Sequence, residues 1–366
     1  MRIYILAMVI VALGSSCKLE SNKKTISGND QTSKSSIIVL EGLGKKIDSL
    51  LQNEIELGFS GSVFVSSGDT VLVQNGYGWT DSTKTTEITP KTSFYLASTT
   101  KGITGTIALL ACEQGLLSLN DPLGKFFSNA PMEHSEITIH DMLIHSSGLT
   151  DEYETFGYTD LKSNISLVFN TSPVNDTRFR YTGAGYWMTA AAIEKASQRR
   201  YEQYVKNELF KKAKMKDTSF WFDIDDTNET LVAQKLKEFP PNGINPNWGF
   251  RASSGILTNI VDLSTFFKAL IDGKLIQEKS LTQLFGPHKT LGSGIGIGYG
   301  WYTSITDRGT TEIWSRGGEE FGHNSAIRWF KDEKLIIAIL TSCGSMEGED
   351  REANRTISDK IEKILF

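Results

Sequence analysis

Residues 94–101 read Phe-Tyr-Leu-Ala-Ser-Thr-Thr-Lys, and this stretch decides the fold. From Ser98 to about Leu117 apolar residues recur at helical spacing, which predicts a helix with Ser98 and Lys101 on its first turn. Residues three apart on a helix are neighbours, with ~5 to 6 Å between their Cβ atoms. The pattern therefore places the hydroxyl of Ser98 beside the amine of Lys101.

This pairing has a chemical meaning, because a serine hydroxyl needs a base within hydrogen-bond reach to become a nucleophile. A lysine amine can be that base when burial disfavours its ammonium form. The free N–H groups of a helix N-terminus can in addition stabilise an oxyanion at the serine. Ser-x-x-Lys alone also fits a plain helix cap at Ser98, so the neighbouring sequence has to decide between the two.

The neighbouring segments resemble, in order, those of the class C β-lactamase, DD-peptidase and family VIII esterase group. Besides residues 94–101, the segments are 113–122 (Glu-Gln-Gly-Leu-Leu-Ser-Leu-Asn-Asp-Pro), 142–149 (Met-Leu-Ile-His-Ser-Ser-Gly-Leu), 179–186 (Phe-Arg-Tyr-Thr-Gly-Ala-Gly-Tyr) and 251–259 (Arg-Ala-Ser-Ser-Gly-Ile-Leu-Thr-Asn). The resemblance covers roughly residues 45 to 345. It implies a sheet lobe and a helical lobe with the serine between them, and ester or amide hydrolysis through an acyl-enzyme on Ser98.

The resemblance also assigns roles beyond Ser98 and Lys101. It implies that Tyr181 exchanges protons with the serine and the leaving group, the plain alternative being a buried core aromatic. A third motif on a strand at the cleft edge is matched by residues 314–318, Trp-Ser-Arg-Gly-Gly. In this motif Ser315, Gly317 and Gly318 are expected to border the substrate, with the Gly318 N–H as an oxyanion donor.

Two positions depart from the family pattern. Gly183 stands where the family commonly has Asn, and Ser315 stands where it has a cation. Arg316 is next to Ser315, but neighbouring strand residues point to opposite faces. These departures weaken the case for β-lactam hydrolysis more than the case for serine chemistry, and the Trp-containing third motif resembles the esterase branch. They also motivate the alternative of a catalytically weak or inactive binding protein of the cell envelope.

Strand and helix patterns predict an α/β-mixed (α+β) fold: an antiparallel sheet flanked by helices plus an inserted all-helical lobe. The resemblance implies that this fold is β-lactamase/transpeptidase-like. The folded domain is expected over residues 39–366, with the sheet lobe from about 39–90 and 290–366 and the helical lobe from about 91–289. The predicted helices are 43–57, 185–197, 201–210 and 350–365. The predicted strands are 61–66 and 70–77, joined by Ser67-Gly68-Asp69, and 298–304, 311–315, 324–330 and 334–341.

The N-terminus predicts export. Arg2, an apolar run over residues 3–13 and small residues before Cys17 are typical of a lipoprotein signal peptide over residues 1–17. The run is about half of the ~20 residues that span a bilayer. We expect Cys17 to carry a lipid anchor, residues 18–38 to form a flexible tether, and the domain to lie in the bacterial cell envelope, facing the periplasm or the cell surface. Leu13 is one place farther from the cysteine than the lipoprotein pattern has it, so ordinary secretion stays open.

The charge and cysteine content of the chain indicate which kinds of partner to expect. The formal net charge is −5 and no Lys/Arg block stands out, so nucleic acid is not expected as a partner. Cys112 and Cys343 lie in apolar stretches and are expected to be buried free thiols. The expected partner is a small-molecule or peptide ester or amide, with no metal and no cofactor, and the chain is expected to be a monomer.

Some tempting motifs are given structural interpretations. His140 with Asp141, and His145, are assigned to a structural loop near the serine helix. The glycine-rich run 292–296 is not flanked by the strand and helix of a nucleotide loop, and is expected to be a flexible loop near the cleft rim.

Overall fold

The computed structural model describes residues 36–150, 157–175, 178–221, 247–320, 322–344, 346 and 352–366. The predicted signal peptide, Cys17 and nearly all of the predicted tether lie outside the described residues. Within those residues, no helix is both long and apolar enough to cross a membrane.

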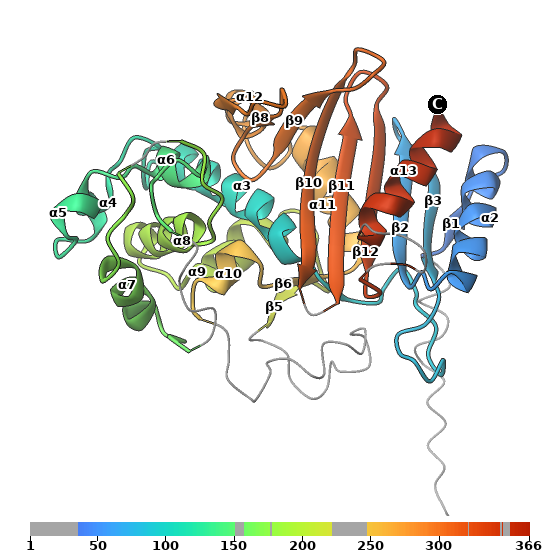
Figure 1. Cartoon of the computed structure of the whole chain (residues 1–366), viewed down its shortest axis with the longest axis horizontal. Coiled ribbons are helices and arrows are strands. Elements are labelled where there is room, and N and C mark those ends of the chain that lie inside the picture. The colour runs from blue at the N-terminus through green and yellow to red at the C-terminus, as the bar shows by residue number, and fades with distance from the viewer. Residues whose placement is uncertain are drawn as a thin grey trace, which may run out of the picture.

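Figure 1 shows the helices and strands in chain order. The strands are β1 (Ile38–Val39), β2 (Gly61–Ser67), β3 (Thr70–Tyr77), β4 (Phe94–Tyr95), β5 (Ser219–Phe220), β6 (Ile256–Thr258), β7 (Lys289–Thr290), β8 (Gly296–Ile297), β9 (Tyr302–Ile305), β10 (Thr311–Glu320), β11 (His323–Phe330) and β12 (Leu335–Thr341). The helices are α2 (Leu43–Glu56), α3 (Thr100–Glu113), α4 (Leu123–Phe126), α5 (Met132–Ser135), α6 (Ile139–Leu143), α7 (Leu161–Phe169), α8 (Ala184–Ser197), α9 (Tyr201–Val205), α10 (Phe250–Ser253), α11 (Ile260–Ile271), α12 (Glu278–Phe285) and α13 (Ala353–Leu365), with a 3₁₀ turn at Ala97–Thr99 and a π-helical turn at Lys206–Phe210.

One large antiparallel sheet organises the molecule. Its nine strands lie in the order β1-β3-β2-β12-β11-β10-β9-β8-β7, so the N- and C-terminal segments pair through β2 and β12. The predicted hairpin is confirmed: β2 and β3 pair antiparallel across Gly68, whose φ of 54° suits a glycine. A second, three-stranded sheet, β4-β6-β5, lies within the sequence range of the predicted helical lobe.

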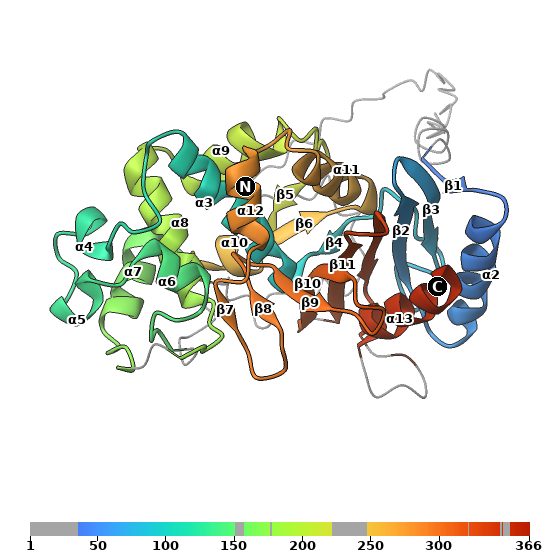
Figure 2. The same cartoon turned by 90° about the horizontal axis from the view of Figure 1, so that it is seen from above.

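Helices cover both faces of the large sheet. Residues Ala353, Ile357 and Ile361 of α13 recur every four positions and are buried with α2 against one face. Figure 2 shows α11 on the opposite face, where it packs on β2 and β12. The α+β architecture with a helical lobe beside it matches the prediction, except that α11 lies on the sheet although its residues fall within the range expected for the helical lobe.

Several predicted boundaries were wrong for local reasons. The helix after Ser98 ends at Glu113 instead of Leu117, since Gly115 has a φ of 70° and breaks the helical path. Residues 298–301 form a turn between β8 and β9 instead of a strand, with Gly300 at a φ of 79°. The glycine-rich run 292–296 belongs to the hairpin that joins β7 to β8.

Candidate active site

Ser98 lies on the 3₁₀ turn that precedes α3, at the end of the helix nearest to β10. The preceding residue, Ala97, has a φ of 47°, an uncommon backbone conformation for a residue with a Cβ atom. Ser98 Oγ accepts hydrogen bonds from Lys101 Nζ at 3.1 Å and from Tyr181 OH at 2.8 Å. The serine side chain makes no capping bond to the helix, so the plain helix-cap interpretation was wrong.

Lys101 is buried beneath the serine, with only 4% of its surface exposed. Its Nζ donates to the carbonyl oxygen of Ser253 at 3.0 Å and lies 4.9 Å from the centre of the Tyr181 ring. No carboxylate lies within ion-pair distance of this amine among the described residues. The amine is therefore directed at Ser98 by a neutral carbonyl and by aromatic rings.

Tyr181 is 39% exposed, so the alternative of a buried core aromatic was wrong. Its hydroxyl reaches Ser98 while its ring lies 4.5 Å from the imidazole of His145, measured between ring centres. The structure thus brings together the three side chains that the sequence nominated as nucleophile and proton relay: Ser98, Lys101 and Tyr181.

His145 holds the backbone on both sides of Tyr181. Its carbonyl accepts from Arg180 N at 2.8 Å, and its Nδ1 accepts from Thr182 N at 3.1 Å. The side chain is 2% exposed, and burial, reinforced by the charge of Lys101, lowers the pKa of His145 to about 3. His145 is therefore a neutral imidazole near neutral pH, with its proton on Nε2. Sequence reasoning assigned it to a structural loop and missed the contact with Tyr181, because no local pattern reports a contact across 36 residues.

The third motif lies on β10, and its three nominated residues differ in their surroundings. Ser315 is only 2% exposed and donates to the carbonyl of Gly300. This burial is contrary to the expectation that its side chain borders the substrate. Gly317 packs on the serine turn: a Cβ atom there would lie 2.8 Å from Ala97 Cβ. Gly318 follows at a break in the β10–β11 register, between Gly317 and Glu320. The missing Cβ atom of Gly317 lets the strand approach the turn that carries Ser98, whereas a Cβ atom on Gly318 would instead lie 3.2 Å from Glu352 Oε1.

Arg316 does not replace the missing cation. Its guanidinium lies 4.7 Å from the centre of the Trp314 ring, and burial together with Arg328 lowers its pKa. Arg328 bonds to Asp359 of α13, so Arg316 belongs to the face of the sheet that α13 covers. The expectation that this side chain points away from the site agrees with that placement.

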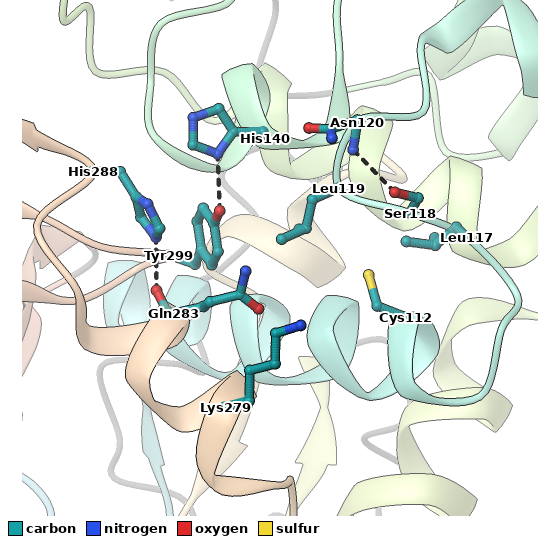
Figure 3. A pocket seen from close by; sticks show the side chains of 10 residues that line it. All are labelled: Cys112, Leu117, Ser118, Leu119, Asn120, His140, Lys279, Gln283, His288 and Tyr299. Atoms are coloured by element: carbon teal, nitrogen blue, oxygen red, sulfur yellow. Dashed lines mark hydrogen bonds between the residues drawn. The ribbon is translucent and has the colours of Figure 1, made fainter.

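A separate pocket of about 490 Å³ lies at the far end of α3, lined by Cys112, His140, Tyr299 and residues of α12 (Figure 3). His140 Nδ1 hydrogen-bonds to Tyr299 OH at 2.8 Å, while Asp141 caps the N-terminus of its own helix, so these two residues form no triad with Ser98. The two cysteines in the described part of the chain are free thiols and are half-buried instead of fully buried. In the same part, no cluster of three or more His, Cys, Asp or Glu side chains could hold a metal ion.

The fold and the cluster around Ser98 define a protein of the serine β-lactamase-like superfamily. The chain belongs to the Beta-lactamase family, whose sequence model matches residues 48–361, and the resemblance seen in the motifs is thereby confirmed.

The individual relatives described next share between 18% and 29% sequence identity with this chain. The chain is 29% identical over 333 residues to PbpX of Bacillus subtilis (strain 168), provisionally named a penicillin-binding protein, covering 89% of this chain and 79% of PbpX. It shares 21% identity and a TM-score of 0.73 with the octameric penicillin-binding protein homologue from Pyrococcus abyssi, over 88% of this chain and 77% of that one. The D-amino acid amidase from Ochrobactrum anthropi SV3, complexed with L-phenylalanine amide, gives 18% identity and a TM-score of 0.74, over 88% and 98% of the two chains. These two structures establish the fold.

Proposed function

We propose that this chain is a serine hydrolase that cleaves an ester or amide through an acyl-enzyme on Ser98. One observation carries the proposal: Ser98 Oγ lies within hydrogen-bond distance of both Lys101 Nζ and Tyr181 OH. Both neighbours donate to Oγ in this arrangement. Loss of one proton from the pair turns that neighbour into the acceptor for the serine proton, which is what a nucleophile of this kind requires.

The reaction follows from that geometry. Ser98 Oγ attacks the substrate carbonyl carbon as its proton passes to Lys101 or Tyr181, and a tetrahedral oxyanion forms. Collapse of this intermediate breaks the bond to the leaving group, which takes the proton, and an acyl ester remains on Ser98. A water molecule then gives its proton to the same pair, its oxygen attacks the ester, and the acid departs as Ser98 recovers a proton.

Two backbone N–H groups are suited to stabilise the oxyanion. One belongs to Ser98 at the start of the helical segment, and the other to Gly318 on β10. The absence of a Cβ atom at Gly317 supports this role for β10, because any larger residue would hold the strand away from the turn.

The name of one structural relative, a D-amino acid amidase, supports an amide substrate. Two other relatives are named for penicillin binding, but the departures at Gly183 and Ser315 disfavour a β-lactam for this chain. The buried Ser315 presents no cation to a substrate carboxylate. The inactive alternative is disfavoured by the intact contacts of Lys101 and Tyr181 with the serine. We also propose that the protein is exported and anchored through Cys17, on the strength of its N-terminal sequence alone.

Covalent labelling tests the proposal. Purified protein is treated with a fluorophosphonate probe and, separately, with a fluorescent penicillin, beside the Ser98→Ala variant. We expect fluorophosphonate labelling that depends on Ser98 and little or no penicillin labelling. Penicillin labelling at a comparable rate would move the assignment to a penicillin-binding enzyme. Absence of Ser98-dependent labelling by either probe would leave the inactive binding protein as the better account.

A further inference from the structure

The space beside Gly183, where the family commonly has Asn, is filled by a different side chain. A Cβ atom on Gly183 would lie 3.2 Å from Nε1 and 3.3 Å from Cε2 of Trp187, one turn further along α8. These distances are tighter than ordinary carbon contacts, so the indole would have to move by a few tenths of an ångström to admit a Cβ atom at this position. An asparagine side chain at position 183 and the indole of Trp187 would therefore crowd each other.

Trp187 also makes a contact that leads to the catalytic amine. Its Nε1–H donates to Ser253 Oγ at 2.9 Å, and the carbonyl of the same Ser253 accepts from Lys101 Nζ at 3.0 Å. Ser253 is buried at the end of α10, and Trp187 is 7% exposed. Hydrogen bonds in such a dry environment are costly to leave unmade, so the indole restrains the residue that holds Lys101.

The indole also meets another glycine. A Cβ atom on Gly249, just before α10, would lie 2.1 Å from Trp187 Cγ. No side chain larger than hydrogen fits there while the indole keeps its place. Gly183 and Gly249 thus both border the slot that the indole of Trp187 occupies, and its Nε1 reaches Ser253.

We propose that Trp187 is a positioning residue for Lys101: it takes the space of the absent amide and fixes the amine through Ser253. This inference rests on the proposed function. The inference has a consequence for the substrate. The indole N–H is already bonded to Ser253, so it cannot replace the asparagine amide that would contact an acylamino group of the substrate. The site accordingly discriminates little between substrates with and without an acylamino substituent next to the scissile carbonyl.

The first test removes only the N–H donor. Trp187→Phe keeps an aromatic ring in the slot, and its rate of fluorophosphonate labelling is expected to fall about tenfold, the effect of ~1.4 kcal/mol for a lost buried hydrogen bond. The pH at which labelling is half-maximal should also shift, because Lys101 is held differently. Trp301→Phe is the control: Trp301 is 1% exposed against 7% for Trp187, its ring packs on Gly102 of α3, and its Nε1 has no hydrogen-bond partner in the described part of the chain. This control should keep the wild-type rate and pH profile.

The second test introduces the asparagine of the family pattern and removes the indole. Gly183→Asn alone should slow labelling, because its side chain crowds the indole and shifts the ring that bonds to Ser253. In combination with Trp187→Leu it should label faster than either single variant, since the asparagine then has room to reach the lysine. Melting temperatures and circular dichroism of each variant establish that the compared molecules are folded.

The outcomes separate the two proposals. Equal rates and equal pH profiles for Trp187→Phe and Trp301→Phe would overturn the inference while wild-type labelling upholds the proposed function. If the losses in labelling rate of Gly183→Asn and Trp187→Leu simply add in the double variant, the two side chains do not share a space and a role, and the inference is contradicted. Wild-type protein that is not labelled on Ser98 at all would overturn the proposed function and this inference with it.

Discussion

His145→Asn tests how the fold keeps a neutral ring against Tyr181. Asparagine can present its side-chain oxygen to Thr182 N, where His145 Nδ1 accepts at 3.1 Å. It also tolerates the φ of 58° at this position better than most residues. The substitution therefore keeps the hydrogen bond and the backbone conformation while it removes the titratable imidazole of His145.

The sign and size of the effect follow from the pKa. Burial, with the nearby charge of Lys101 adding to it, lowers the pKa of His145 to about 3 in the folded protein, against ~6.5 in an unfolded chain. The unfolded chain then binds more protons between these values, so the stabilisation is full above about pH 6.5 and is lost progressively as pH falls towards 3. At about pH 5 the loss is roughly 2 kcal/mol relative to pH 8.

Urea unfolding at about pH 8 and pH 5 measures this difference. The free energy of unfolding of the wild type should fall by roughly 2 kcal/mol more than that of His145→Asn over this interval. His134→Asn is a control at a second buried histidine, whose ring contacts Phe169. Burial lowers the pKa of His134 too, so the free energy of unfolding of His134→Asn should also depend less on pH than that of the wild type. The rate at which Ser98 is labelled should stay at the wild-type value in this control. Parallel pH dependences of wild type and His145→Asn would refute the reasoning.

Three further substitutions probe other parts of the site and fold. Gly317→Ala places a Cβ atom 2.8 Å from Ala97 Cβ, and a shift of the serine turn by ~1 Å should lower the labelling rate about 100-fold; an unchanged rate would show that the strand does not constrain the turn. Lys101→Met should slow labelling by about 10²- to 10⁴-fold at pH 7 in a protein that still melts cooperatively, so a rate near that of the wild type would remove lysine from the mechanism. Arg328→Met strands three carboxylates of β10 and α13 that the guanidinium now binds, and urea unfolding should report a loss of about 3–5 kcal/mol, whereas a loss below ~1 kcal/mol would contradict a stabilising network.

Local spacing predicted part of this molecule well. Alternating and β-branched residues around Gly68 gave the β2–β3 hairpin, because two strands and a tight turn are specified by neighbouring residues. The contact between Ser98 and Lys101 followed from a separation of three on a helix. Tyr181 was found only through a family resemblance, since 83 residues separate it from the serine and no local pattern carries that distance.

The rest depended on contacts between distant segments. Trp187 reaches Lys101 through Ser253, and these residues meet because α3, α8 and α10 pack against one another. The burial of Ser315 follows from the turn over residues 298–301, which was mistaken for a strand. Backbone carbonyls, such as the one that holds Lys101, leave no signature in side-chain patterns at all.

The central claim is that Ser98 becomes acylated with the help of Lys101 and Tyr181. Its most direct test is a peptide map of protein trapped with a fluorophosphonate, read by tandem mass spectrometry. We predict that the adduct lies on Ser98, that it forms much more slowly in Lys101→Met and Tyr181→Phe, and that it is absent in Ser98→Ala. An adduct on any other residue, or one that forms at the wild-type rate in both relay variants, would contradict the account.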